Sequence, residues 1–408
     1  MPAPIIDFIK QQATVPVADL WKDAPENASS TYAAYWYKAA ACLLLSGHIS
    51  PKVDGHPNMT DATRMCKEAN FNPYLLQRIA GFLTCAEVVK VKPSGDYGPG
   101  PSFAAFWRHE PKALMVIARQ GVLTIVKERT GYQVWRPTDV SYSHLIEFLS
   151  VFFGCFQGLA LREGELGGVF RRFSALPRHD LARAAKVMGV GVDDMRVGGW
   201  QNWLDEKGQT ALISALHTAE WAYCTERKGV EWFIPSPMGL GMLGLGNVPP
   251  PLRLPTDLRV LPNHCIFAGA GLEMEQLTCF FRYCRVKRID QVFEFQVDPR
   301  RLAEMPAKSL PGPALLAALK DAEPLPANVL AELNGTPKLG GVVSIRWCNA
   351  LVKPQTPETI AAIQRHPKLK GYLEAGAPPG YLLIKSSSDP RSFIRRCEEL
   401  GFEVQMLR

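Results

Sequence analysis

The chain lacks the short motifs that identify most common enzyme classes. It contains no Gly-Lys-Ser or Gly-Lys-Thr, and therefore no P-loop lysine that could reach nucleotide phosphates. It also has no Gly-x-Ser-x-Gly nucleophile elbow and no His-Glu-x-x-His zinc helix. The eight histidines are scattered along the chain. We therefore predict a non-catalytic protein without a cofactor, although a triad assembled in space from distant residues is invisible to this reasoning.

Paired cysteine spacing is missing as well. The ten cysteines occur singly and mostly inside apolar segments, which is typical of reduced thiols in a cytoplasmic protein. One local group, His264, Cys265, Cys279 and Cys284, has metal-ligating residue types but no Cys-x-x-Cys spacing. Buried thiols commonly serve as small apolar side chains. We expect no metal site.

The sequence has no long uninterrupted apolar run. The most apolar stretch, residues 144–161, is broken by Glu147, Gln157 and two glycines, and it is shorter than the roughly 20 residues of a spanning helix. The amino terminus lacks the basic flank and apolar core of a secretory leader. These features predict a buried core helix at 144–161, a cytoplasmic location and no membrane partner.

What the chain does contain is the composition of a folded protein. It has 408 residues, of which 47% are hydrophobic, and this length suits two to four domains. The formal charge of +7 permits contact with phosphates or with anionic proteins. The pattern of elements predicts a helix-rich α+β protein.

The first hundred residues follow the order of a winged helix. We expect three helices, at 32–45, from an N-cap at Thr60 to 69, and at 73–83, followed by a strand at 87–92 and a turn at 93–98. Three helices and a strand pair resemble the winged-helix plan. We therefore predict a winged-helix-like domain over residues 1–100.

The middle of the chain predicts a connector and a second winged-helix-like domain. Residues 101–176 are expected to be mostly helical, with a β-hairpin formed by 122–127 and 132–135. Residues 177–250 repeat the earlier order, with helices at 180–188, 200–204 and 209–217 and a hairpin of 221–224 with 230–234. Pro249–Pro251 then forms a stiff linker.

Three glycines near this linker have the spacing of a dinucleotide-binding loop. Gly239, Gly241 and Gly244 match Gly-x-Gly-x-x-Gly, but a proline precedes them and Pro249 to Pro251 follow closely. A nucleotide loop must instead follow a strand and open a helix. We expect no nucleotide there.

Residues 251–408 predict a small α+β domain with a mixed sheet. Strands are expected at 258–261, 264–268, 292–297, 342–347, 381–385 and 402–407. Helices are expected at 272–282, 298–302, 311–319 and after Asp389-Pro390. The step Pro324-Leu325-Pro326-x-Asn328-Val329 lies between the strands expected at 292–297 and 342–347.

This succession resembles the helicase-associated domain at the amino terminus of XPB-type DNA-repair helicases, which also occurs in shorter bacterial proteins. The resemblance covers roughly the last 150 residues in element order and in the Pro324–Val329 step. It implies a module that accompanies DNA transactions. Because this chain has no P-loop, the resemblance implies an accessory part acting beside a separate motor.

Candidate DNA-contacting residues are the cations. The densest group follows the helix expected at 272–282, and the others lie on the third helix or on the hairpins of the two winged-helix-like domains, where such domains touch grooves and backbone. They are Arg282, Arg285, Lys287, Arg288, Arg78, Lys90, Lys92, Arg227 and Lys228. The competing interpretation is a solvated surface without function.

Three functional hypotheses remain, one of which is an enzyme whose site is assembled in space from distant residues; the other two are binding proteins. The first is a DNA-binding accessory protein, in DNA repair or another helicase-dependent process, with DNA as partner and a separate helicase or nuclease as a further candidate partner. The alternative is a protein–protein docking scaffold without DNA contact, for which the aromatic cluster Tyr32, Tyr35, Trp36 and Tyr37 is suited.

Overall fold

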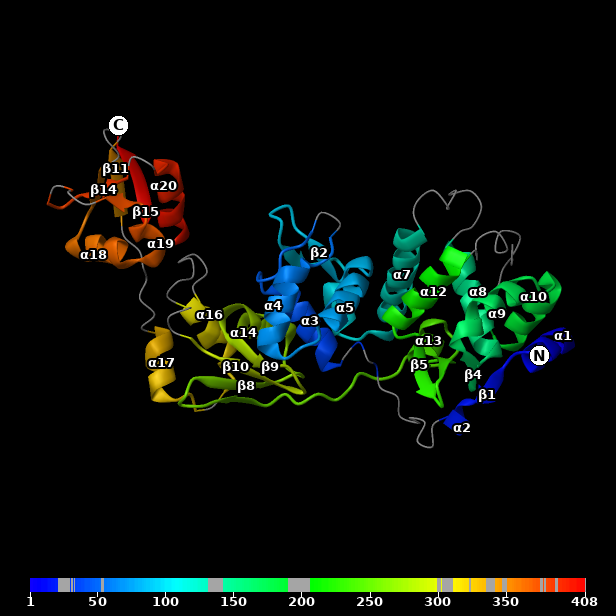
Figure 1. Cartoon of the computed structure of the whole chain (residues 1–408). Helices are drawn as coiled ribbons and strands as arrows, with labels where there is room; N and C mark the ends of the chain where they lie inside the picture. Colours follow the sequence, from blue (N-terminus) through cyan, green and yellow to red (C-terminus); the bar gives the residue numbers. More distant parts are fainter. Residues whose placement is uncertain are drawn as a thin grey trace. The chain divides into compact units, whose positions relative to one another are not determined.

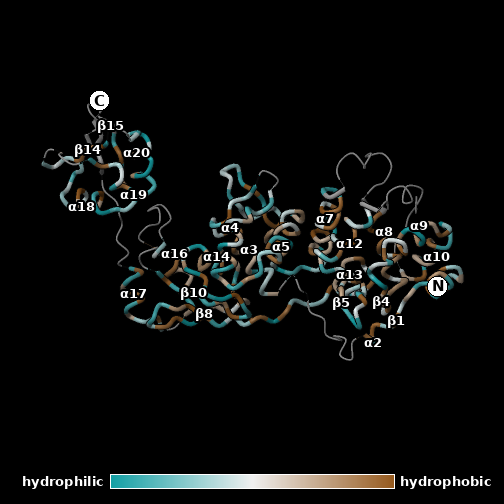
Figure 2. The backbone as a smooth tube through the Cα atoms, in the orientation of Figure 1, coloured by the Kyte–Doolittle hydropathy of each residue, from teal (hydrophilic) through white to brown (hydrophobic). Residues whose placement is uncertain are grey.

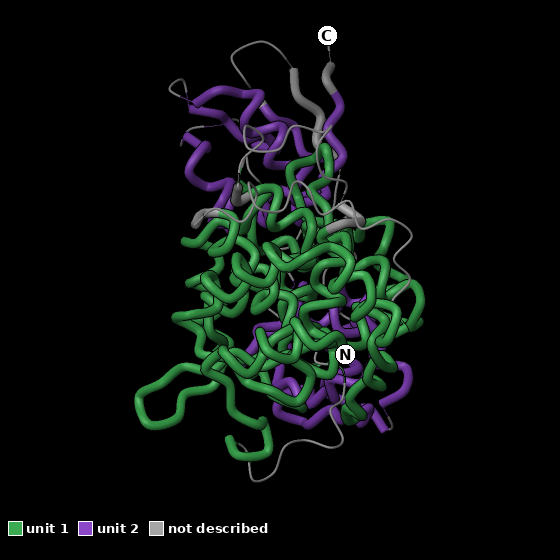
Figure 3. Tube along the Cα trace, turned by 90° about the vertical axis from the view of Figure 1, so that its right-hand side faces the viewer, with its two compact units in different colours: residues 1–255, 288–291 green, residues 256–287, 292–408 purple. Residues whose placement is uncertain are grey.

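The computed structural model divides the chain into two compact units. Unit 1 comprises residues 1–255 and 288–291, and unit 2 comprises residues 256–287 and 292–408 (Figure 3). The structure describes residues 1–20, 30, 32, 34–52, 55–130, 142–189, 206–298, 302, 311–322, 324–334, 342–346, 351–374, 377, 379–385 and 388–407. The predicted α+β class is confirmed (Figure 1). The winged-helix architecture and the four domain ranges stay predictions.

Unit 1 contains the predicted order of three helices and a strand pair. These elements are α3 (Tyr35–Leu45), α4 (Met59–Ala69), α5 (Pro73–Cys85), β2 (Val89–Val91) and β3 (Tyr97–Pro99). Strands β2 and β3 form an antiparallel pair of their own. Helix α5 is capped by the side chain of Asn72, as Asn-Pro predicts, but the predicted cap Thr60 is wrong, because Asn58 accepts the Thr60 amide at 3.0 Å.

The predicted β-hairpin in the connector is wrong. After α6 (Phe103–Trp107), residues 122–127 belong to one long helix, α7 (Pro111–Thr130). Val122, Ile125 and Val126 are buried at helical spacing, and Gly121 of α7 lies against the Phe82 ring of α5. Packing on one helical face therefore overrides the strand preference of these β-branched residues. The second predicted strand, 132–135, lies outside the described residues.

The apolar stretch near residue 150 forms a core helix, but a shorter one than the predicted 144–161, because the helix ends at Cys155 and residues 159–161 belong to strand β4 (Leu159–Arg162). Helix α8 (Tyr142–Cys155) places Phe148 and Phe152 in an aromatic cluster with α9 (Leu166–Ser174). The ring centroids of Phe152 and Phe170 are 4.4 Å apart, and those of Phe148 and Phe173 are 5.9 Å apart. Among the described residues, no helix has the length and apolar character needed to cross a membrane.

A four-stranded sheet joins distant parts of unit 1. Its order is β1 (Thr14–Pro16), β4 (Leu159–Arg162), β6 (Val230–Pro235) and β5 (Ala222–Arg227). The hairpin predicted at 221–234 is thus confirmed, as β5 and β6, within a larger sheet. The other elements of the unit are α1 (Ala3–Lys10), α2 (Val17–Leu20), η2 (Glu163–Glu165), α10 (Arg178–Val187), α12 (Glu206–Thr218) and α13 (Pro237–Met242). The helix predicted at 200–204 lies outside the described residues.

Unit 2 opens with a second four-stranded sheet covered by one helix. The strand order is β7 (Leu258–Val260), β8 (Cys265–Gly269), β10 (Val292–Gln296) and β9 (Arg285–Arg288), and the helix is α14 (Met274–Tyr283). Phe280 and Phe281 of α14 contact Phe295 of β10, with ring centroids 5.6 and 5.1 Å apart. Figure 2 shows hydrophobic and hydrophilic residues mixed along these strands, as a sheet with one buried face requires.

The rest of unit 2 forms a separate mixed sheet, so the strands predicted for one mixed sheet over residues 251–408 are divided between two sheets. Helices α16 (Pro311–Ala318) and α17 (Ala327–Asn334) precede this sheet in the chain. The strand order of the sheet is β13 (Leu373–Glu374), β14 (Leu382–Ile384), β12 (Leu351–Pro354), β11 (Val342–Arg346) and β15 (Glu403–Leu407). Strands β11 and β15 are parallel, and the other pairs are antiparallel. Helices α18 (Pro357–Arg365), α19 (Pro367–Lys370) and α20 (Pro390–Glu399) complete the unit. Residues 299–301 of the helix predicted at 298–302 lie outside the described residues.

The carboxyl-terminal β-α-β prediction is confirmed in detail. Asp389 caps α20 by accepting the amides of Arg391 and Ser392, each at 3.1 Å. Phe393 and Cys397 are fully buried, and they join the apolar core that α20 shares with β12 and β14. Phe393 and Cys397 are four residues apart and therefore lie on the one face by which α20 packs.

Candidate nucleic-acid interface

The densest cationic segment of the sequence is itself a strand. Residues Arg285-Val286-Lys287-Arg288 form β9, an edge strand that follows directly on α14. Val286 is buried, whereas Arg285 and Lys287 are exposed. Side chains alternate along a strand, so Arg285 and Lys287 point away from the face that α14 covers. Charged side chains on an edge strand also prevent its pairing with another chain, which is the non-functional explanation for them.

The uncovered face of this sheet continues from β9 across its neighbours. The strand registers place Arg259 of β7 opposite Phe267 of β8, and Phe267 opposite Glu294 of β10. Directly paired residues share one face, so these three side chains form a row across the sheet. On the other face Ile266, Ala268, Phe293 and Phe295 are buried beneath α14.

We call the residues Arg259, Phe267, Glu294, Arg285 and Lys287 the outer sheet face. Its three cations and one carboxylate leave a formal charge of +2. Within the part of the chain that the structure describes, Arg285 and Lys287 form no ion pair. The face thus presents an incompletely buried aromatic ring between Arg259 and Glu294, with Arg285 and Lys287 on the edge strand of the same sheet, and cations together with an aromatic ring suit a nucleic-acid strand.

The other two cations of the predicted patch, Arg282 and Arg288, do not belong to the outer sheet face. Arg282 is in the last turn of α14, on the helix that covers the opposite face. Arg288, at the end of β9, is paired with Asp290, with 2.8 Å between Nη2 and Oδ2. The structure therefore brings Arg285 and Lys287 together and separates Arg282 from them. Sequence reasoning missed Arg259 and Phe267, because only strand pairing shows that residues so far from β9 share its face.

The lysines predicted on the first hairpin have different surroundings. Lys90, in β2, is exposed. Lys92 is exposed at the beginning of the turn, and its aliphatic stem lies against Gly98, where an added Cβ would come within 2.0 Å of the Lys92 Cε.

The second hairpin carries its predicted cations at its tip. Lys228 and Gly229 both have positive φ, 54° and 74°, as a two-residue hairpin turn requires. The guanidinium of Arg227 donates through Nη1 to the carbonyl oxygen of Asp19. Lys228 thus lies on the turn itself, whereas the Arg227 side chain is hydrogen-bonded to the backbone at Asp19.

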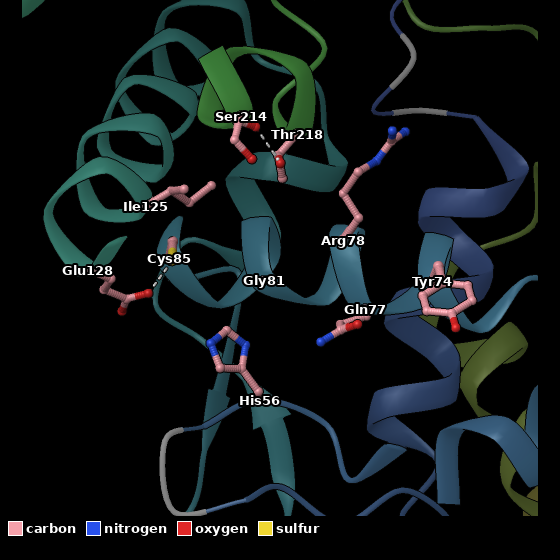
Figure 4. A pocket seen from close by; sticks show the side chains of 10 residues that line it. All are labelled: His56, Tyr74, Gln77, Arg78, Gly81, Cys85, Ile125, Glu128, Ser214 and Thr218. Carbon is pink, nitrogen blue, oxygen red and sulfur yellow. Dashed lines mark hydrogen bonds between the residues drawn. The ribbon is translucent and has the colours of Figure 1, made fainter. Parts of the chain in front are cut away.

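Arg78 lies on the predicted third helix, in the lining of a pocket. It forms an ion pair with Glu220, with 3.7 Å between Nη2 and Oε1. It also lines a pocket in unit 1, which we call the α5 pocket (Figure 4). The pocket is lined by His56, Tyr74, Gln77, Arg78, Gly81, Cys85, Ile125, Glu128, Ser214 and Thr218. Arg78 is therefore placed to contact a small group that enters between helices.

The aromatic cluster considered for protein docking is largely a core. Tyr32 and Tyr37 are 1% and 0% exposed, and their ring centroids lie 5.0 and 6.3 Å from that of Phe82. Tyr35 and Trp36 are only partly exposed. Two of the four aromatics thus offer no surface to a partner.

The cysteines considered for metal binding and the glycines considered for nucleotide binding are packed against other parts of the chain. Cys284 is buried, and the Cys279 thiol donates to the carbonyl of Ala314 at 3.4 Å. Burial raises the pKa of Cys279 to about 11. Gly239 and Gly241 are buried in α13, where an added Cβ would lie 2.2 Å from the Trp221 carbonyl oxygen and 2.7 Å from that of Asn247. Close backbone packing explains these two glycines.

No protein-family model matches the chain, and no curated protein matches it. The functional assignment therefore depends on the residues of this chain and on the resemblance of its last 150 residues or so.

Proposed function

We propose that the chain is a non-catalytic DNA-binding accessory protein, which holds DNA through its phosphate backbone and positions a separate motor in DNA repair or another helicase-dependent process. The outer sheet face carries this proposal. It lies in the region that resembles the helicase-associated domain, and it presents Arg259, Arg285 and Lys287 on one uncovered surface.

The spacing of these cations suits a polyanion. Arg285 and Lys287 are two residues apart on one face of β9, which places their Cα atoms about 6.7 Å apart. That distance is close to twice the axial spacing of about 3.4 Å between charges in one DNA strand. Such contacts give affinity that does not depend on base sequence and that decreases with salt.

The proposal is tested by the salt dependence of DNA binding. Fluorescence anisotropy with a labelled duplex would give the slope of log K against log salt for the wild-type chain and for Arg285→Ala with Lys287→Ala. Each lost phosphate contact reduces that slope by about 0.9, so the double variant should lose about 1.8. Lys368→Ala with Lys370→Ala, which removes two exposed cations that are also two residues apart, from α19 of the same unit, is the matched control and should leave the slope unchanged.

Charge reversal separates the outer sheet face from the patch defined by sequence alone. Arg285→Glu with Lys287→Glu should weaken binding more than Arg285→Glu with Arg288→Glu, because Arg288 is already paired with Asp290. The melting temperatures should stay near that of the wild type, since all three side chains are exposed. If no duplex or forked DNA binds at low salt, or if the reversals leave the affinity unchanged, the proposal is wrong.

A further inference from the structure

The α5 pocket has the size of a small-ligand site. Its volume is about 460 Å³, within the range of about 300–1,000 Å³ typical of such sites. Five of its residues, Tyr74, Gln77, Arg78, Gly81 and Cys85, recur at helical spacing and make one face of α5 the floor. Helices α7 and α12 contribute the walls, so every element of the pocket belongs to unit 1.

A glycine keeps the floor of this pocket open. Gly81 is in the interior of α5, where glycine is less favourable than alanine. An added Cβ would meet nothing within 4 Å, and the residue has no positive φ. Neither close packing nor the left-handed conformation therefore requires glycine at this position. The missing side chain leaves free volume above the helix, between Gln77 and Cys85.

The polar groups of the pocket offer both donors and acceptors. The Gln77 amide can donate and accept, and Arg78 donates. Glu128 accepts from the Cys85 thiol at 3.4 Å and has capacity for more bonds, since a carboxylate has about four acceptor sites. Figure 4 shows Gln77, His56 and the Cys85–Glu128 pair around one opening. Arg78 and Glu128 have opposite charges, so the lining does not favour a highly charged anion.

A flat ring with donors and acceptors on its edge matches this lining. Nucleobases have that form, and glutamine, glutamate and arginine are residues that read base edges. Tyr74 lines the pocket, is 76% exposed overall, and offers a ring on which a base can stack. We infer that the α5 pocket binds one unpaired base of a nucleic-acid strand. The inference rests on the proposed function and names its substrate as DNA with a single-stranded segment, because a base inside a duplex cannot enter the pocket.

The test compares a short single-stranded oligonucleotide with the duplex of the same sequence, using anisotropy and the full chain. Gly81→Leu fills the pocket floor, and Gln77→Ala removes the amide. Each should weaken single-strand binding about 10-fold, which is within the range for loss of one stacked base, and leave duplex binding unchanged. Gly81→Ala should weaken single-strand binding while raising the melting temperature, because alanine favours the helix. Val116→Leu, at a 68% exposed position of α7, is the control for added side-chain volume.

The outcomes distinguish this inference from the proposed function. If duplex binding is normal but the pocket variants bind the single strand as the wild type does, the pocket inference is wrong and the proposed function stands. Free adenosine and cytidine, observed by saturation-transfer NMR, provide a test without any DNA backbone. Nucleoside binding that Gly81→Leu abolishes, together with no binding of either oligonucleotide, would keep the pocket and overturn the DNA-binding proposal. Failure of nucleosides and oligonucleotides alike would overturn both.

Discussion

Replacing Tyr32 with phenylalanine tests whether the first aromatic cluster is a core or a docking surface. The Tyr32 hydroxyl donates to the Ala219 carbonyl at 2.6 Å and accepts from the Trp221 indole nitrogen at 3.2 Å. Both partners lie at least 187 residues away in the sequence. Tyr32→Phe keeps the ring, which stacks on Phe82 with 5.0 Å between centroids, and removes these two hydrogen bonds alone.

The expected cost follows from what the variant leaves unpaired. Trp221 is fully buried, and each buried donor or acceptor without a partner costs about 1–3 kcal/mol. We therefore expect Tyr32→Phe to lower the free energy of unfolding by about 2–4 kcal/mol. Tyr37→Phe is the matched control, because its hydroxyl reaches the Thr218 carbonyl only at 3.5 Å. That control should cost about 0.5–1 kcal/mol.

Urea denaturation followed by tryptophan fluorescence measures both variants, since every tryptophan except Trp347 belongs to unit 1. Burial raises the pKa of Tyr32 well above its ordinary value, so the hydroxyl stays protonated and the cost should be equal at pH 6 and pH 9. A loss below about 1 kcal/mol, or one no larger than that of Tyr37→Phe, would refute the core assignment. It would return these aromatics to the docking interpretation.

Two further predictions concern glycine packing and thiol reactivity. Gly241→Ala should lower the free energy of unfolding by about 1–3 kcal/mol, because its Cβ would lie 2.7 Å from the Asn247 carbonyl oxygen. Gly246→Ala, with nothing within 4 Å, should leave thermal stability unchanged or slightly higher, and equal melting temperatures for the two would contradict this reasoning. Cys224 is exposed, but partial burial and then Glu163 raise its pKa to about 12, so iodoacetamide should label it slowly at pH 8 and faster as the pH rises. Glu163→Gln removes the carboxylate and should speed labelling at pH 8, measured by mass spectrometry, whereas an unchanged rate would mean that Glu163 does not raise this pKa.

Some elements were predictable because their signals are local. Asn72-Pro73 and Asp389-Pro390 each combine a side-chain cap with a proline at the first helical position, and both open helices. The apolar stripe of α20 and the aromatic stretch of α8 also specify buried helices, because periodicity identifies the face that packs. Elsewhere local preference was misleading. Residues 122–127 contain β-branched residues typical of a strand, and only their packing against α5 and α12 makes them helical.

The sequence by itself determined the cations of β9, the glycines of α13 and the absence of a P-loop lysine. The tertiary structure decided what those residues do. Strand pairing placed Arg259 and Phe267 in one row with Glu294 of β10, the strand next to β9, and close backbone approach accounted for Gly239 and Gly241. Burial turned Tyr32 and Tyr37 from candidate docking residues into a core. A face, a pocket or a core is made of residues distant in the chain, and their proximity depends on long-range packing that no local pattern records.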